Sequence, residues 1–293
     1  MTVLHRSRVL MNKVLAPLGV EVRRTPRPDI SFKEKASEGA QKQDYPIHVR
    51  PDTPRYINIG SGKFFHECWH NIDMPSEWYA KKGVGGGNWP IHIPFDLTSG
   101  EPLPIADGTV ELAYTSHVVE HIPEPDVRHM LAEVHRCLMV GGLLRVTCPD
   151  MDLNYDALMR NDLEHWSWPS AYDLTTIEQR FLENLATELV VGYRDERTET
   201  LTDAEVREIL QSMPKEAALD FIIAKTNPAL QRENPGHHVG WFNTEKMLDF
   251  LKAAGFKEVW ESAFGQSRSR ILRNIQLFDT THPEQSLYVE ARK

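Results

Sequence analysis

The sequence predicts an α/β protein with a doubly wound, mostly parallel sheet and a helical insertion. Three observations support this prediction. Over residues 55–150, short apolar runs alternate with turns and one clear helix, which is typical of parallel strands connected by helices. Residues 151–235 carry helical, acidic and aromatic signals but few strand signals. Residues 236–293 return to strands and one helix, so we interpret the stretch before them as an insertion between sheet elements.

Four strands are expected in the first part of the sheet, each a short apolar run bounded by turn residues. They are Arg55–Ile59, a strand closed by Asn71-Ile72-Asp73, the run Ile91–Leu97, and Val110–Thr115. The fourth strand is entered through the turn Ala106-Asp107-Gly108.

Residues 125–138 predict an amphipathic helix, because their apolar side chains recur at helical spacing. The predicted buried face is Val127, Met130, Leu131, Val134 and Leu138. We expect Gly141-Gly142 to stop this helix, as glycine commonly does just after a helix. Leu143–Cys148 then reads as a buried strand that ends at Pro149.

The end of the chain predicts one more helix and two more strands. Thr244–Ala254 has helical spacing and is followed by Gly255. Val259–Phe264 and Leu287–Ala291 are expected to be strands. The chain therefore divides into four segments, at residues 1–50, 51–150, 151–235 and 236–293.

The first segment is an arm with a predicted amphipathic helix. Its apolar and basic side chains are Val9, Leu10, Val14, Leu15 and Leu18, with Arg6, Arg8 and Lys13 between them. Such a basic amphipathic segment can lie on an anionic membrane surface, so residues 1–25 are a candidate for peripheral membrane contact. The alternative is that the helix docks on its own core or on a partner chain.

Composition excludes several classes of protein. The formal net charge of −9 argues against a nucleic-acid partner, because proteins that grip a phosphate backbone usually carry the opposite sign. No run approaches 18 apolar residues, so we expect no transmembrane segment, and no secretory signal is recognised. Cys68, Cys137 and Cys148 lack zinc-ligand spacing, which indicates a reducing, cytoplasmic compartment. The oligomeric state is left open.

Polar residues and glycines gather at the predicted strand ends. Gly60-Ser61-Gly62 follows the first strand, where glycine lets a ligand approach the backbone closely. Asp73 ends the second strand and could accept both hydroxyls of a ribose, whereas Asp96 ends the third and could accept from an adenine amino group. Ligands of open parallel sheets bind outside these strand ends, although either Asp alone could be a cap or turn residue. Phe65 stands where a dinucleotide fingerprint would have its third glycine, which argues against a nicotinamide enzyme.

A longer series of motifs carries a resemblance. The series is Phe95-Asp96-Leu97, Leu103–Glu111, Ser116–Ile122, Leu131–Leu138, Gly141-Gly142 and Pro149-Asp150. In this order, over residues 55–150 and 236–293, the chain resembles class I S-adenosylmethionine-dependent methyltransferases of the small-molecule branch. The tail Ser286–Ala291 is similar to bacterial members associated with surface-glycan biosynthesis. The resemblance implies a Rossmann-like sheet with an antiparallel last strand, S-adenosylmethionine as cofactor, and residues 151–235 as a lid over the substrate.

The resemblance also implies roles for single residues. Gly60 and Gly62 would face the methionine part of the cofactor, Asp73 would hold the ribose, and Asp96 and Leu97 would border the adenine. Further cofactor-binding positions implied are Asn58, Ser61, Met74 and Ser116. Asn58 stands where the family usually has an acidic residue, and only eight residues, 63–70, lie between Gly62 and Asn71. A crossover with its helix needs at least about 10–12 residues, so the first helix should be very short or irregular.

Methyl transfer to a hydroxyl needs alignment of the reactants, worth on the order of 7–11 kcal/mol, and a base that works near neutral pH. The candidate bases are His117, His121, His237 and His238, and Glu120 could orient a histidine. The alternative is that Glu120 and His121 only cap the following turn and that His237 and His238 only pack a loop.

His117-Val118-Val119-Glu120-His121 also matches H-x-x-E-H, the inverted zinc-protease motif. That motif needs one long helix, which Pro123 and Pro125 exclude on the C-terminal side. A zinc hydrolase is therefore a remote alternative. We expect no metal, and a divalent ion held by His117, Glu120 and His121 is the alternative.

The insertion carries aromatic residues that could line an acceptor pocket: Trp166, Trp168, Tyr172 and Tyr193, with Arg194 beside them. Burial against the core is the commoner fate of such side chains. The predicted function is O-methylation of a sugar, sugar nucleotide or glycan intermediate, a choice of acceptor that rests on the resemblance alone. The main alternative is a non-catalytic binding module with a methyltransferase-like sheet.

Overall fold

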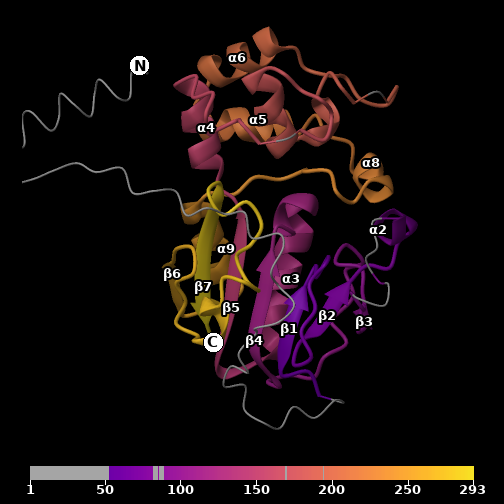
Figure 1. Ribbon diagram of the computed structural model, residues 1–293, viewed down its shortest axis with the longest axis vertical. Helices are drawn as coiled ribbons and strands as arrows, with labels where there is room; N and C mark the ends of the chain where they lie inside the picture. Colours follow the sequence, from indigo (N-terminus) through magenta and orange to yellow (C-terminus); the bar gives the residue numbers. More distant parts are fainter. Residues whose placement is uncertain (1–52, 82–84, 86–88, 169, 194) are drawn as a thin grey trace, which may run out of the picture. The chain divides into compact units, whose positions relative to one another are not determined.

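The computed structural model describes residues 53–81, 85, 89–168, 170–193 and 195–293 (Figure 1). The predicted arm at residues 1–50, with the amphipathic segment at 1–25, lies outside the described residues. Within the described ranges, no helix combines the length and apolar character needed to span a bilayer.

The described strands form one seven-stranded sheet with the order β3-β2-β1-β4-β5-β7-β6. The strands are β1 (Tyr56–Ile59), β2 (His70–Asp73), β3 (Ile93–Pro94), β4 (Val110–Ser116), β5 (Leu138–Pro149), β6 (Glu258–Glu261) and β7 (Ser286–Arg292). β1 to β5 pair in parallel, whereas β7 is antiparallel to both β5 and β6. This order confirms the predicted Rossmann-like sheet with an antiparallel strand at the end of the chain.

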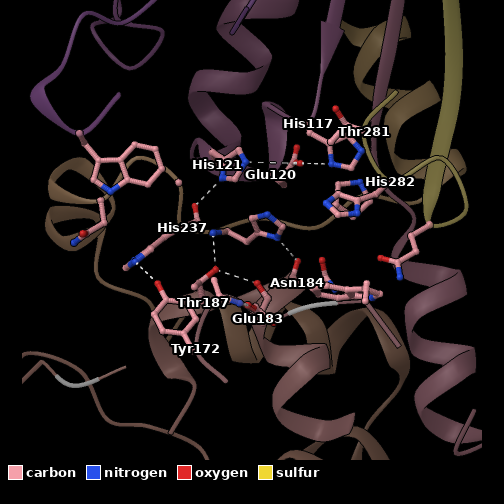
Figure 2. A pocket seen from close by; sticks show the side chains of 18 residues that line it. His117, Glu120, His121, Tyr172, Glu183, Asn184, Thr187, His237, Thr281 and His282 are labelled. Carbon is pink, nitrogen blue, oxygen red and sulfur yellow. Dashed lines mark hydrogen bonds and ion pairs between the residues drawn. The ribbon is translucent and has the colours of Figure 1, made fainter. Parts of the chain in front are cut away.

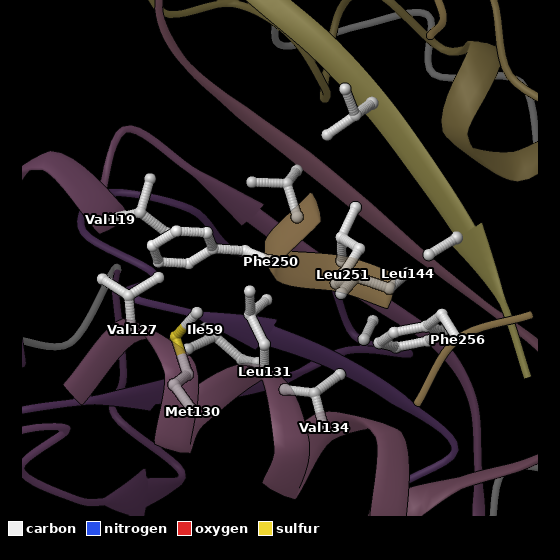
Figure 3. Packing of buried hydrophobic residues seen from close by; sticks show 14 of the residues in the cluster. Ile59, Val119, Val127, Met130, Leu131, Val134, Leu144, Phe250, Leu251 and Phe256 are labelled. Atoms are coloured by element: carbon white, nitrogen blue, oxygen red, sulfur yellow. The ribbon is translucent and has the colours of Figure 1, made fainter. Parts of the chain in front are cut away.

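One face of the sheet packs against α3 (Glu124–Cys137) and α9 (Thr244–Ala253), as Figure 3 shows. The buried residues of α3 are Val127, Met130, Leu131, Val134 and Cys137. They include the first four members of the predicted apolar face and meet Phe250 and Leu251 of α9 in the same cluster. Burial of each large side chain stabilises the fold by about 1.5–3 kcal/mol.

Loops and the short 3₁₀ helix η5 (Ile271–Arg273) supply the apolar side chains on the other face. Trp69, Leu272 and Phe278 pack there against Tyr56 and Tyr114 of the sheet. The same region buries an ion cluster: Arg145 lies 2.5 Å from an Asp279 oxygen and 3.1 Å from a Glu290 oxygen, and all three side chains are fully buried. The two buried carboxylates share this one guanidinium, and each also accepts a backbone N–H, Asp279 from Gly265 and Glu290 from Arg268.

The helix predicted at residues 125–138 is confirmed as α3, but the predicted stop at Gly141-Gly142 was wrong. α3 ends at Cys137 and the chain enters β5 directly, so Gly141 and Gly142 lie inside the strand. The register of β5 against β4 shifts between the pairs Val110↔Leu138 and Leu112↔Leu143. Gly141 has φ +82°, and a Cβ on Gly142 would come within 2.9 Å of Met139 O. The glycine pair therefore forms a bulge in the strand. Such a bulge requires glycine, as the end of a helix commonly does.

Two predicted strands are shorter than expected. The third strand is only Ile93–Pro94 rather than 91–97, and the sixth is Glu258–Glu261 rather than 259–264. Pro94 has no N–H to give to a ladder, and His92 pairs with Asn71 partly through its ring, because Asn71 N–H donates to His92 Nδ1. Both strands lie at the edges of the sheet, where pairing is one-sided.

The segment between β1 and β2 contains no helix among its described residues. Turns closed by Phe64 N–H to Ser61 O (2.9 Å) and Trp69 N–H to His66 O (3.0 Å) connect the strands instead. This confirms the irregular connection expected from its length. A short helix, α2 (Glu77–Lys81), follows β2.

Residues 151–235 hold helices and, among the described residues, no strand. The helices are α4 (Met151–Met159), α5 (Ile177–Leu185), α6 (Asp203–Ser212), α7 (Lys215–Ile223) and α8 (Pro228–Glu233). They enclose an apolar cluster of their own, which includes Phe181, Leu185 and Leu219. Figure 1 shows them beyond the end of β5 from which α4 continues. The chain then returns along residues 236–243, where Val239 N–H donates to Glu120 O (2.8 Å).

Candidate active site

The glycine loop after β1 turns in the left-handed region. Gly60 has φ +63° and Gly62 has φ +50°. A Cβ on Gly60 would lie 2.3 Å from Val118 Cγ2, whereas a Cβ on Gly62 would meet nothing within 4 Å. Gly60 is therefore required by the protein's own packing, and Gly62 borders open space that a ligand could use.

Asp73 is held at the end of β2 by this loop. Gly62 N–H donates to its Oδ2 and Met74 N–H to its Oδ1, each at 2.8 Å, while Ser61 Oγ lies 3.4 Å from Oδ2. Burial raises the pKa of the Asp73 carboxyl above its ordinary value, against the lowering effect of these hydrogen bonds. The fixed carboxylate keeps lone pairs for further donors. Asp73 could therefore accept from two adjacent hydroxyls of a ribose, beside the open backbone of Gly62.

The other predicted cofactor residues lie around this edge. Phe95 N–H donates to Asp73 O (3.0 Å), which brings the neighbouring Asp96 close to the end of β2. Asp96 Oδ1 accepts hydrogen bonds from Thr98 N–H and Thr98 Oγ1, both at 2.8 Å. One of its two oxygens therefore has the turn role that was the alternative to cofactor binding. Leu97 packs on the main core and Asn58 is buried within β1. Ser116 is the last residue of β4.

His117 comes directly after β4 with φ +54°, a conformation that is strained for a residue with a Cβ. Its Nε2 lies 2.8 Å from Ser286 Oγ, and that hydroxyl also lies 2.8 Å from His282 O, to which it can only donate. Nε2 is therefore the donor to Ser286, and Nδ1 can also donate to Glu120 only when the ring carries a proton on both nitrogens. The other ring nitrogen, Nδ1, lies 3.1 Å from Glu120 Oε1. Both nitrogens of His117 are thus engaged by the protein.

Glu120 lies in the 3₁₀ turn Val119–His121 and is 1% exposed. Burial acts to raise the pKa of its carboxyl, but His117, followed by the charges of His121 and His238, lowers that pKa to about 2. The turn therefore keeps a buried negative charge at neutral pH. Because the turn has only three residues and is followed by Pro123, the H-x-x-E-H motif does not lie on one long helix.

The positions of the proton on His121 and His238 follow from their hydrogen bonds. His121 Nδ1 lies 3.1 Å from His237 O, and His238 Nδ1 lies 2.7 Å from Asn184 O. A carbonyl oxygen only accepts, so each Nδ1 carries the proton and each neutral ring has its lone pair on Nε2. The two rings meet edge to face with centroids 4.6 Å apart. Burial, aided by the neighbouring His121, lowers the pKa of His238 to about 3, so this ring is neutral at physiological pH.

These residues line a cavity of about 440 Å³. Figure 2 shows His117, Glu120 and His121 on one side of it and Tyr172, Glu183 and Asn184 facing them. The described residues that line it are Trp78, His117, Glu120, His121, Pro149, Trp168, Ala171, Tyr172, Glu183, Asn184, Thr187, Asn234, Gly236, His237, His238, Thr281, His282 and Gln285, with no Lys or Arg among them. The cavity thus joins the end of β4 to the helical insertion.

The aromatic residues of the insertion fall into two groups. Some line the cavity, as predicted for an acceptor pocket, and others are buried in the core, as the alternative interpretation expected. Trp168 and Tyr172 line the cavity, and Tyr172 OH lies 3.1 Å from His237 Nε2. Trp166 is 5% exposed and belongs to the apolar core of the insertion, as the alternative reading expected. Tyr193 packs edge to face on His237, and Arg194 lies outside the described residues.

Sequence reasoning did not identify the contribution of α2. Trp78 lines the cavity, and its ring approaches Gly236 so closely that a Cβ there would lie 2.3 Å from it. Burial, together with the charges of Asp73 and Glu120, raises the pKa of Tyr79. Tyr79 therefore lies within the electrostatic reach of both the glycine loop and the histidines. Nothing in the short run Glu77–Lys81 signals this position.

Comparison with protein-family models finds one match. Residues 69–146 match the model described as a methyltransferase domain (Methyltransf_11), a stretch that begins after the glycine loop and ends within β5. No curated protein matches the sequence.

Several solved structures are similar. An S-adenosylmethionine-dependent methyltransferase from Mesorhizobium loti is 15% identical over 82% of this chain and 91% of its own, with a TM-score of 0.38. A methyltransferase of the same kind from Archaeoglobus fulgidus is 14% identical over 83% of this chain and 87% of its own, with a TM-score of 0.40. Human N-acetylserotonin methyltransferase, in complex with the cofactor, is 14% identical over 82% of this chain and 47% of its own, with a TM-score of 0.38. The strand order of the sheet, rather than these scores, identifies the fold.

Proposed function

We propose that this S-adenosylmethionine-dependent methyltransferase transfers its methyl group to a hydroxyl of a small, neutral acceptor bound among the histidines that follow β4. The observation that carries the proposal is the Nε2 lone pair of His121, which is left free by the bond between Nδ1 and His237 O (3.1 Å). His121 lines the cavity next to the buried carboxylate of Glu120. A neutral imidazole so placed is suited to accept the proton of an acceptor hydroxyl.

The glycine loop and Asp73 are proposed to hold the cofactor. When bound, S-adenosylmethionine supplies a methyl group on a positively charged sulfur, so the leaving group needs no further activation by the chain. Asp73 would accept the ribose hydroxyls, and Gly62 would let the ligand approach the backbone. Asn58, Ser61, Met74, Asp96, Leu97 and Ser116 stay proposed neighbours of the cofactor.

The roles proposed for the remaining polar residues follow from their hydrogen bonds. Glu120 would stabilise the positive charge that forms on His121 after proton transfer, because its Oε1 lies 3.9 Å from His121 Nε2. His117 would act as a positioning residue, since both its nitrogens are engaged by Ser286 and Glu120. His238 has a pKa near 3, which makes it a weak proton acceptor.

The lining of the cavity supports a neutral, hydroxylated acceptor. Trp78, Trp168 and Tyr172 offer flat faces on which a sugar ring can stack, while Asn184 and Asn234 offer amide groups. The side chains that carry a formal negative charge are Glu120 and Glu183, with no Lys or Arg among the described lining residues. A diphosphate would be repelled here, so within the predicted acceptor classes a sugar or glycan intermediate is favoured over a sugar nucleotide.

Three finer statements rest on the sequence alone and stay proposals. They are a place in surface-glycan biosynthesis, a cytoplasmic location, and contact of residues 1–25 with the inner face of a membrane. The four-segment organisation, with residues 151–235 as the substrate lid, is likewise proposed.

The test is turnover with a panel of acceptors. Purified protein with S-adenosylmethionine should release S-adenosylhomocysteine with a neutral sugar or glycan acceptor and not with the matching nucleoside-diphosphate sugar. Preference for the charged acceptors would contradict the assignment of the acceptor class.

A second candidate function, a non-catalytic binding module, is favoured by one observation, the absence of a helix among the described residues between β1 and β2. A protein that binds S-adenosylhomocysteine but turns over no acceptor in the panel would support the module.

A further inference from the structure

We propose that Glu120, His121 and His238 form a binding site for one divalent cation of the zinc class. One ligand atom from each residue lies within 4.8 Å of the others. Zinc bonds to nitrogen and oxygen are about 2.0–2.2 Å long, so binding would draw the three atoms together by side-chain rotation. The three residues come from two separate parts of the chain, the turn after β4 and the segment that leaves the insertion.

The two histidines already have the arrangement that metal ligands usually have. A metal-bound histidine commonly donates its other ring N–H to a backbone carbonyl, which fixes the ring and the tautomer. His121 does this to His237 O at 3.1 Å, and His238 does it to Asn184 O at 2.7 Å. Both Nε2 atoms are then free to bind a cation without prior loss of a proton.

The backbone holds the two parts of the site in register. Val239 N–H donates to Glu120 O (2.8 Å), and His238 N–H donates to Thr187 Oγ1 (2.9 Å). Thr187 Oγ1 in turn donates to Glu183 O (3.0 Å) on α5. The segment that carries His238 is therefore tied to the turn of Glu120 on one side and to the insertion on the other.

The surroundings of Glu120 are an independent indication that this cluster can take a cation. Its side chain is buried, and among the described residues no backbone N–H or hydroxyl donates to either carboxylate oxygen. His117 Nδ1 lies at ion-pair distance, 3.1 Å, from Glu120 Oε1. No such ion pair reaches Glu120 Oε2 among the described residues. A buried carboxylate with so few donors is costly unless a cation or further donors complete it.

The geometry corrects the metal site that the sequence suggested. His117 was the third ligand in that set, but its Nε2 is bonded to Ser286 and its Nδ1 points to Glu120. His238, more than 100 residues further along the chain, takes its place. His117 would instead be a positioning residue that holds the carboxylate.

The donor set indicates the class of cation. Two imidazole nitrogens and one carboxylate oxygen suit zinc and its neighbours among the transition metals, whereas magnesium and calcium prefer oxygen ligands. Three protein ligands leave at least one coordination position, and all three residues line the cavity.

The cation would use the lone pair of His121 that the proposed function assigns to proton transfer, so that assignment applies to the metal-free chain. The metal site itself does not rest on the proposed function, because cation binding is measured without cofactor or acceptor. A failure of one therefore does not imply a failure of the other.

The test uses the full chain, stripped with a chelator and dialysed. Titration with Zn²⁺ by calorimetry, and with Co²⁺ by its visible absorption, should give one saturable site per chain. Glu120→Gln, His121→Ala and His238→Ala should each weaken Zn²⁺ binding by at least about 100-fold, and His117→Ala by about 10-fold, the lower end of the effect of a residue that orients a ligand. His129→Ala is the matched histidine control, since His129 bonds Glu101 O away from the cluster, and it should bind as the unaltered protein does.

Circular dichroism of each variant before titration separates loss of the site from loss of the fold. A variant that does not fold is replaced by the glutamine substitution at the same histidine. The absence of a saturable site in the unaltered protein would overturn the proposal. So would binding that persists in folded His238→Ala or His238→Gln, or a loss in His117→Ala that exceeds the loss in His238→Ala.

Discussion

The glycine loop with Asp73 and the histidine cluster around Glu120 differ in where their partners come from. Asp73 is bonded by Gly62 and Met74, which lie 11 residues and one residue away in the chain. His121 is bonded by His237, which is 116 residues away, and His238 by Asn184, which is 54 residues away. The first region is a local strand–turn–strand unit, and the second exists only when the insertion has folded beside β4.

This difference decides what a sequence can reveal. Motifs at adjacent strand ends share one edge of the sheet by topology, so the glycine loop and Asp73 could be recognised together. The histidines could be named as candidates, but their bonding partners could not, because those partners depend on the tertiary arrangement of residues 184–238. This difference implies that the two regions are separable, so a substitution in one should leave the function of the other unchanged.

The largest effect is expected from His121→Ala. Loss of the proton acceptor should lower the rate of methyl transfer by about 10²–10⁴-fold. Because the side-chain hydrogen bond and the ion pair of His121 in the described residues involve none of the proposed cofactor residues, the affinity for S-adenosylhomocysteine should stay unchanged. Single-turnover rates and a calorimetric titration check the two halves of this prediction. A His121→Ala variant that keeps the full rate in metal-free protein would show that the base lies elsewhere.

Two glycine substitutions sharpen the description of the first region. Gly60→Ala should cost about 2–5 kcal/mol of unfolding free energy, because it adds a left-handed strain of about 1–2 kcal/mol to an overlap with Val118. Gly62→Ala adds the same left-handed strain but no overlap, because a Cβ there meets nothing within 4 Å. It should therefore lower the unfolding free energy by only about 1–2 kcal/mol. Urea denaturation measures both. Equal costs would contradict the close contact between the loop and Val118.

Asp73→Asn should weaken binding of S-adenosylhomocysteine by about 10–100-fold, since hydrogen bonds to a charged group contribute about 1.5–3 kcal/mol. Asp96→Asn is the matched control, because Asp96 already gives one oxygen to Thr98, and it should change the affinity by only a few-fold. Isothermal titration compares them. A larger loss in Asp96→Asn would mean that Asp96 rather than Asp73 is the main anchor.

The smallest expected effect is a pH dependence of stability that belongs to the histidine cluster. The folded-state pKa of His238 is about 3, so between that value and its ordinary pKa near 6.5 the unfolded chain binds the proton and the folded chain does not. Stability should therefore fall as pH falls from about 6.5 toward 3. The pKa of Glu120, about 2, adds a further loss as pH falls below about 4.5.

His238→Gln should flatten this dependence between pH 6.5 and 5, where Glu120 contributes little. Thermal unfolding followed by circular dichroism at pH 7 and 5 gives the measurement, with His129→Ala as the control that should keep the slope of the unaltered protein. An unchanged slope in His238→Gln would mean that His238 does not bury its neutral ring as described.

The sheet was largely predictable from the sequence, and the errors in that prediction have physical causes. The apolar face of α3, from Val127 to Val134, was predicted correctly because it repeats at helical spacing. Gly141-Gly142 was misassigned because the left-handed backbone of Gly141 suits a strand bulge as well as a helix end. The edge strand β3 was overextended because apolar residues flank Pro94, whose missing N–H limits pairing.

The candidate site was predictable only as a set of residues. His117 and His238 were both named as catalytic candidates, yet the roles that their contacts support are different. Strain at His117 and the hydrogen bond from His238 to Asn184 O are tertiary features that no local pattern encodes. The place of Trp78 in the cavity could not be predicted, because it depends on packing against Gly236, which lies far along the chain.

The most direct test is whether the glycine loop after β1, which no helix follows before β2, binds the cofactor. A calorimetric titration of the purified protein with S-adenosylhomocysteine, and with NAD as the control, measures this in a single experiment. We predict one saturable site for S-adenosylhomocysteine, weakened by about 10–100-fold in Asp73→Asn, and no heat of binding for NAD. No binding of S-adenosylhomocysteine by the folded protein, or binding that Asp73→Asn leaves unchanged, would contradict the assignment of the glycine loop and Asp73 as the cofactor site.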